Sequence, residues 1–73
     1  MNSVIELVEM IQDVLELSIS EEDIITHFDQ LDGWDSVYSL RLITSIEAQI
    51  NRKVPIGEFL QAHNIQEVYN LIA

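Results

Sequence analysis

Apolar residues recur at helical spacing in two long stretches, and this periodicity constrains the fold more than any other feature of the chain. Residues 3–17 place Val4, Leu7, Val8, Ile11, Val14 and Leu15 on one stripe. Residues 36–51 place Val37, Leu40, Ile43, Ile46 and Ile50 on a second stripe, with Leu42 on its flank. Such spacing is typical of amphipathic helices, and no segment alternates as a half-buried strand does. We therefore predict an all-α fold.

Residues that start and stop helices add two further elements. Ser3 and Asn64 each precede a glutamate by three positions, a pattern typical of a capping box at a helix start. Pro55 prevents the second helix from continuing, and residues 57–62 follow as a short helix. In the last helix Ile65, Val68, Leu71 and Ile72 are expected to face inward. The sequence predicts a small four-helix bundle, with three main helices and one short helix.

A long connection, residues 18–35, separates the first two helices. Ser20 is followed by three acids, which favours one short helical turn near residues 21–27. The apolar residues expected to hold this segment against the core are Ile24, Ile25, Phe28 and Leu31. A connection of this length in a small domain is usually functional or partly structured.

The length of 73 residues suffices for one hydrophobic core, so we expect a single domain over residues 1–73 and a monomer. The chain has no cysteine, which excludes disulfides, thiolate zinc sites and cysteine nucleophiles. The first residues carry acids where a signal peptide has positive charge, and no apolar run is long enough to span a membrane. We therefore expect a cytoplasmic protein.

Acidic residues outnumber basic ones by 13 to 3, for a formal net charge of -10. A nucleic acid partner is not expected, because binding it requires Lys and Arg to neutralise phosphates. Ten of the 13 acids lie in residues 1–35, which contain no Lys or Arg, whereas residues 36–73 hold three of each sign. The acidic half either attracts a basic partner enzyme or only keeps the chain soluble.

The usual catalytic and metal-binding patterns are not present in the sequence. His27 and His63 lie far apart in the chain, and no cysteine is available to complete a zinc site. Asp29, Asp32 and Asp35 are three residues apart, whereas a calcium loop of the EF-hand type needs ligands two apart. No serine lies in a GxSxG motif, and two glycines cannot form a Gly-rich phosphate loop. We expect no metal, no catalytic residue and no enzyme activity.

The stretch "LDGWDSVYSL", residues 31–40, leads into the second helix. Gly33 permits a tight turn, and Trp34 can pack the loop while its indole N–H finds a backbone acceptor. Asp35 or Ser36 can cap the helix that begins at Val37. The Ser36 hydroxyl would then lie at the positive end of a helix, beside unpaired N–H groups that stabilise an attached phosphate. Locally, Ser36 is either an ordinary cap or an attachment point.

From residue 31 to residue 72 the sequence resembles acyl and peptidyl carrier proteins, and the first helix and acidic loop agree in length. The matching residues are Asp35, Ser36 and Val37, supported by "VPI" at 54–56, by Phe59 and Leu60, and by "NIQEVYNLI" at the end. The resemblance implies that Ser36 receives covalent 4′-phosphopantetheine from coenzyme A. It also implies that Asp35 orients the loop and that an acyl or aminoacyl group is carried as a thioester.

The resemblance further implies three kinds of partner: a phosphopantetheinyl transferase, an adenylating or acyl-loading ligase, and an acyltransferase or synthase. The partner-facing residues are expected to be Val37, Tyr38, Arg41 and Leu42. Tyr38 and Arg41 could instead be ordinary solvated positions, and Leu42 with Ile46 could close the core or line a site for a short cargo.

Fatty-acid carriers usually have an acidic second helix, whereas here Glu47 is its only acid, and Arg41 would repel a basic docking patch. The segment "VPIGEFLQAHNIQEV" at 54–68 resembles peptidyl and D-alanyl carriers more than fatty-acid carriers. This resemblance implies a stand-alone carrier of a specialised pathway of the polyketide or nonribosomal peptide type. Two alternatives stay open within the family, a D-alanyl carrier and a fatty-acid carrier. An alternative of another class is an unmodified helical interaction domain in which Ser36 is only a cap.

Overall fold

Helix α1 (Val4–Leu15) begins at the predicted cap and ends two residues before the predicted boundary in the computed structural model, which describes residues 2–31 and 33–73. The Ser3 hydroxyl accepts the N–H of Glu6 at 3.4 Å, and the Glu6 carboxylate accepts the N–H of Asn2. The helix stops because Glu16 takes the left-handed conformation, with φ of 56°. Such a residue ends the hydrogen-bond ladder of a helix.

Two short 3₁₀ turns, η1 (Glu21–Ile24) and η2 (Phe28–Gln30), shape the connection between the first two main helices. The first turn falls inside the predicted 21–27 segment, and the second was not predicted. Ile24 is buried as expected, but the expectation for Ile25 was wrong, because that side chain is 72% exposed. Adjacent residues of a tight turn point in different directions, so only one of the two isoleucines can reach the core.

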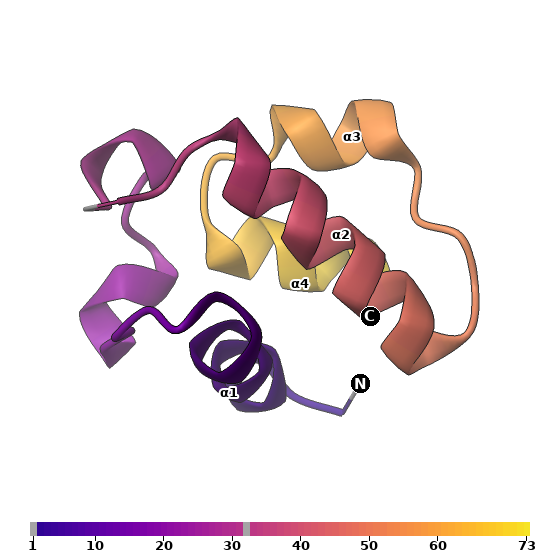
Figure 1. Ribbon diagram of the computed structural model, residues 1–73, viewed down its shortest axis with the longest axis horizontal. Helices are drawn as coiled ribbons and strands as arrows, with labels where there is room; N and C mark the ends of the chain where they lie inside the picture. Colours follow the sequence, from indigo (N-terminus) through magenta and orange to yellow (C-terminus); the bar gives the residue numbers. More distant parts are fainter. Residues whose placement is uncertain (1, 32) are drawn as a thin grey trace.

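The remaining helices are α2 (Ser36–Ile50), α3 (Ile56–Gln61) and α4 (Ile65–Ile72), and the described part of the chain contains no strand. The predicted all-α fold with three main helices and one short helix is confirmed. Figure 1 shows the turns η1 and η2 on one side of the molecule and the loop from α2 to α3 on the opposite side. None of the described helices has the length and apolar character needed to cross a bilayer.

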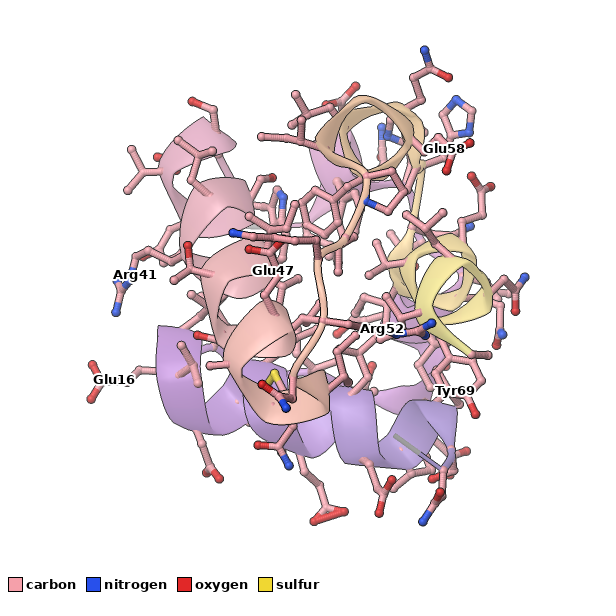
Figure 2. All side chains as sticks on the ribbon, turned by 90° about the vertical axis from the view of Figure 1, so that its right-hand side faces the viewer. Glu16, Arg41, Glu47, Arg52, Glu58 and Tyr69 are labelled. Atoms are coloured by element: carbon pink, nitrogen blue, oxygen red, sulfur yellow. The ribbon has the colours of Figure 1, made fainter. Side chains whose placement is uncertain are left out.

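The core lies where α1, α2 and α4 meet. Its fully buried side chains come in pairs from these helices: Leu7 and Ile11, Leu42 and Ile46, Ile65 and Val68. Helix α3 packs across α2 and α4 and is anchored by Phe59, which is 4% exposed. Val54 is also buried, and its N–H donates to the Glu47 carboxylate at 2.8 Å, which fixes the segment entering α3 (Figure 2).

The buried face of α2 differs from the predicted stripe. Leu42, predicted on the flank, is 0% exposed, whereas Val37 and Leu40 are 60% and 51% exposed. The buried positions Leu42, Ile43 and Ile46 follow the three- and four-residue spacing of one helix face, and Val37 lies on the opposite side. Because α2 carries apolar residues on both sides, its sequence fits either orientation, and packing against α1 and α4 selects one.

Both arginines bind carbonyl groups at the ends of other helices. The Arg41 guanidinium donates to the Val14 carbonyl near the end of α1 at 3.1 Å. Arg52, just after α2, donates to the Ile72 carbonyl at the end of α4 (Figure 2). Positive charge is favourable at a helix C-terminus, so these contacts tie α2 and the loop after it to α1 and α4.

Candidate functional site

The loop before α2 is held by a stacked aromatic pair. Gly33 has φ of +78°, a left-handed conformation that glycine adopts without strain. Trp34 stacks on Phe28 with ring centroids 4.6 Å apart and planes 10° from parallel. The indole N–H donates to the Ser39 hydroxyl at 3.2 Å, so its partner is a side chain on α2 and not the predicted backbone acceptor. These contacts fix the loop against the start of α2.

Asp35, and not Ser36, is the cap of α2. Its backbone is extended, and its Oδ1 accepts the N–H of Val37 at 2.9 Å and of Tyr38 at 3.1 Å. The sequence left the choice open because both residue types cap helices well. We expected unpaired N–H groups beside Ser36. This expectation was wrong for the amides of Val37 and Tyr38, because both donate hydrogen bonds to the Asp35 carboxylate.

Ser36 is the first residue of α2, and its side chain is exposed. Within residues 2–31 and 33–73, no hydrogen bond engages its hydroxyl. Asp32, weighed above as a calcium ligand, lies outside the described residues. The hydroxyl therefore stands on a rigid helix start, at the exit of a long connection, where an incoming enzyme can reach it.

An open hollow of about 620 Å³ adjoins Ser36. The hollow is bordered by the connection, the start of α2, the end of α3 and the turn that leads into α4. Aromatic rings of Phe28, Trp34 and Phe59 form its apolar lining, and the imidazoles of His27 and His63 line it with the residues of the helix start. The exposed Ser36 thus lies at the border between open solvent and a partly apolar recess.

Sequence reasoning missed the pairing of His27 and His63. Their ring centroids lie 5.2 Å apart, and the N–H of Phe28 donates to the His63 carbonyl at 2.8 Å, which joins the connection to the turn before α4. No local pattern could have indicated this contact, because it depends on the docking of two distant segments. The described residues contain no group of three or more His, Cys, Asp or Glu side chains that could hold a metal ion.

The cap of α4 also involves this pair. Asn64 Oδ1 accepts the N–H of Glu67 at 2.9 Å, as predicted, and Glu67 Oε1 accepts the N–H of His63 at 3.0 Å. That backbone hydrogen bond is the main cause that lowers the pKa of Glu67 below its ordinary value of 4.5. Desolvation opposes the change, and the His63 imidazole, with Nδ1 3.1 Å from Oε1, adds to it.

The predicted partner-facing residues do not share one environment. Val37 is exposed, Tyr38 is half-buried beside Trp34, and Arg41 is exposed but hydrogen-bonded to Val14. Leu42 was wrongly assigned to this set, because it is fully buried and closes the core with Ile46. The apolar side chains that α2 and α3 expose are Val37, Leu40, Ile56 and Leu60.

A family model described as "phosphopantetheine attachment site" matches residues 6–72, from the first turn of α1 to the last residue of α4. The chain belongs to this family of carrier proteins. Its members bear covalently attached 4′-phosphopantetheine and carry acyl groups without catalytic activity of their own. No match was found among curated proteins or among solved structures. The resemblance to carrier proteins drawn from the sequence is confirmed.

Proposed function

We propose that Ser36 is the attachment site of 4′-phosphopantetheine and that the chain presents acyl or aminoacyl groups, bound as thioesters, to partner enzymes. The observation that carries this proposal is the exposed hydroxyl at the first residue of α2, free of hydrogen bonds to the described residues. The adjoining hollow leaves room for an arm that is long and flexible. The surroundings of Ser36 thus fit the group that the family carries.

In this proposal the chain itself supplies a nucleophilic hydroxyl and a fixed position for it. Oγ of Ser36 forms a bond to the β-phosphorus of coenzyme A, the bond to the bridging pyrophosphate oxygen breaks, and adenosine 3′,5′-bisphosphate leaves. The proton of the hydroxyl passes to a base of the transferase. Once attached, the arm supplies a thiol whose thioester activates the acyl carbonyl, and the tether raises its effective concentration at each partner.

Asp35 acts in this account as a positioning residue. Its two hydrogen bonds to the first turn keep α2 helical up to Ser36, so the hydroxyl does not fray away from the helix. The stacked Trp34 and Phe28 support the same loop from the other side. We propose that this rigid start is what the transferase recognises.

We further propose that the partner-binding face is the exposed apolar surface of α2 and α3, formed by Val37, Leu40, Ile56 and Leu60. Tyr38 and Arg41 border it, while Glu47, the only acid of α2, is engaged with Val54. Such a surface suits an apolar patch on a partner better than a basic one. This supports a pathway of the polyketide or nonribosomal peptide type over fatty-acid synthesis, with a D-alanyl carrier as the alternative.

The modification can be tested on purified apo protein incubated with coenzyme A and a broad-specificity phosphopantetheinyl transferase. Intact mass should increase by one phosphopantetheine group in the wild type and in Ser45→Ala, but not in Ser36→Ala. Ser45 is a suitable control because it is a serine of the same helix that lies away from the loop before α2. An unchanged wild-type mass would instead favour the unmodified interaction domain.

A further inference from the structure

The start of α2 does not by itself accommodate the anionic phosphodiester of an arm on Ser36. The neighbouring Asp35 carboxylate already accepts hydrogen bonds from the N–H groups of Val37 and Tyr38. It also carries a negative charge, as the phosphodiester does, so the two groups repel each other. The guanidinium groups of the chain lie elsewhere, on the carbonyls of Val14 and Ile72. The side chains that line the hollow are therefore the next candidates for donors to the inner part of the arm.

Two imidazoles line the same hollow as Ser36, and their hydrogen bonds fix which nitrogen carries the proton. His27 Nδ1 accepts the N–H of Asp29 at 3.1 Å, so in the neutral ring the proton is on Nε2. His63 Nδ1 faces Glu67 Oε1 at 3.1 Å, and a carboxylate only accepts, so here the proton is on Nδ1. The neutral pair thus offers one donor and one acceptor through its two Nε2 atoms.

The other polar groups around the hollow are neutral or acidic. Gln61 and Ser39 also line it and are neutral, whereas Asp29 and Asp35 are acidic, and Glu67 faces His63 from α4. Among the described residues, His27 and His63 are the basic side chains that line the hollow. Both are substantially accessible, with side-chain exposures of 46% for His27 and 64% for His63.

If Ser36 bears the arm as proposed above, we propose that this hollow binds its inner part, the phosphodiester and the pantoyl group, and that His27 and His63 hold it there. The Nε2–H of His27 donates to a phosphodiester oxygen. The Nε2 of His63 accepts a hydrogen bond from the pantoyl hydroxyl. The two pantoyl methyl groups pack against the rings of Phe28 and Trp34, which already form an apolar lining. The outer part of the arm, with its thiol, stays in solvent.

Asparagine offers a matched substitution at both histidines, because its amide occupies the place of Nδ1 and nothing replaces Nε2. His27→Asn keeps an acceptor for the N–H of Asp29, and His63→Asn keeps a donor for Glu67. The hydrogen bond from the N–H of Phe28 to the carbonyl of residue 63, which joins the connection to the turn before α4, is retained. The ring contact between the two imidazoles is lost together with both groups offered to the arm. The double variant therefore distinguishes whether the two histidines bind the arm or only support the fold.

The test compares NMR spectra of the apo and arm-bearing forms, with intact mass used to verify loading. In the wild type we expect imidazole ¹⁵N resonances to shift on loading, and nuclear Overhauser contacts between the pantoyl methyls and the ring protons of Trp34 and Phe28. In the double Asn variant those contacts should be lost although loading is complete.

Unchanged imidazole resonances in a fully loaded wild type would overturn the inference and leave the proposed function intact. Contacts that persist in the double Asn variant would equally overturn the role of the histidines. A wild type that gains no mass would instead overturn the attachment at Ser36, and the inference with it.

Discussion

At the scale of single residues, the most consequential contacts are caps. Ser3 and Asn64 could be recognised in advance, because a glutamate three residues later marks each of them. The choice between Asp35 and Ser36 could not be made, since either side chain can accept the first N–H groups of a helix. The pairing of His27 and His63 was invisible because it joins two segments that meet only in the folded chain.

Replacement of Asp35 by alanine should destabilise the fold by about 0.5–2 kcal/mol, because two N–H groups at the start of α2 lose their acceptor. Chemical denaturation measures this change as a lower midpoint. Asp29→Ala is the control, because that carboxylate is 86% exposed and lies outside α2. Equal midpoints for the two variants would show that the cap of Asp35 adds nothing to stability.

The carboxyl of Glu67 should contribute to the dependence of stability on pH. Its pKa is lowered in the folded protein, mainly by the N–H of His63, so the folded state favours the ionised form. This contribution is fully present above the unfolded value, near 4.5, and is lost as pH falls through the lower folded pKa. Unfolding midpoints measured across this acidic range should fall less steeply in Glu67→Gln than in the wild type. Identical slopes would contradict the account.

At the scale of the elements, helix boundaries were predicted closely, but the rotation of α2 was not. Apolar residues lie on both of its sides, and only the packed structure reveals that Leu42 faces the core while Val37 and Leu40 face outward. The sequence pattern of α1 was more decisive because acids mark its outer face, whereas α2 has one acid and several neutral polar residues. Periodicity identifies a helix, and charge on one face identifies its orientation.

The orientation of α2 predicts unequal effects of two leucine truncations. Leu42→Ala should cost about 2–5 kcal/mol, because it leaves a cavity between α1, α2 and α4. Leu40→Ala should change stability by less than about 0.5 kcal/mol, because that side chain is half-exposed on the other side of the helix. Urea unfolding monitored by circular dichroism compares the two. A larger loss for Leu40 would mean that the helix is rotated differently.

At the scale of the whole molecule, charge is distributed unevenly along one small core. The formal net charge is -10, and the first 35 residues hold ten acids and no Lys or Arg. The sequence shows this imbalance directly, but it does not indicate that both arginines bind carbonyl groups at helix ends. Helices α2 and α3 meanwhile offer a largely apolar surface. Helices α2 and α3 contain one acid each, Glu47 and Glu58, so most of the negative charge lies outside the two helices that form the proposed partner-binding face.

Added salt should stabilise the folded chain, because it screens repulsion among acids that folding brings together. The thermal midpoint should rise when sodium chloride is raised from a few millimolar to a near-physiological concentration. The same increase in a variant with Glu21 and Glu22 changed to Gln should be smaller, since both acids lie in the 3₁₀ turn η1 of the acidic half. A midpoint that falls with salt would contradict this view of the molecule.

Whether Ser36 carries the arm is decided by locating the modification within the chain. The protein loaded by a phosphopantetheinyl transferase is digested, and its fragments are sequenced by tandem mass spectrometry. We expect the added mass on Ser36 in the fragment containing "GWDSVYS", with Ser39 in the same fragment unmodified. Added mass on any other residue, or on none, would contradict this expectation.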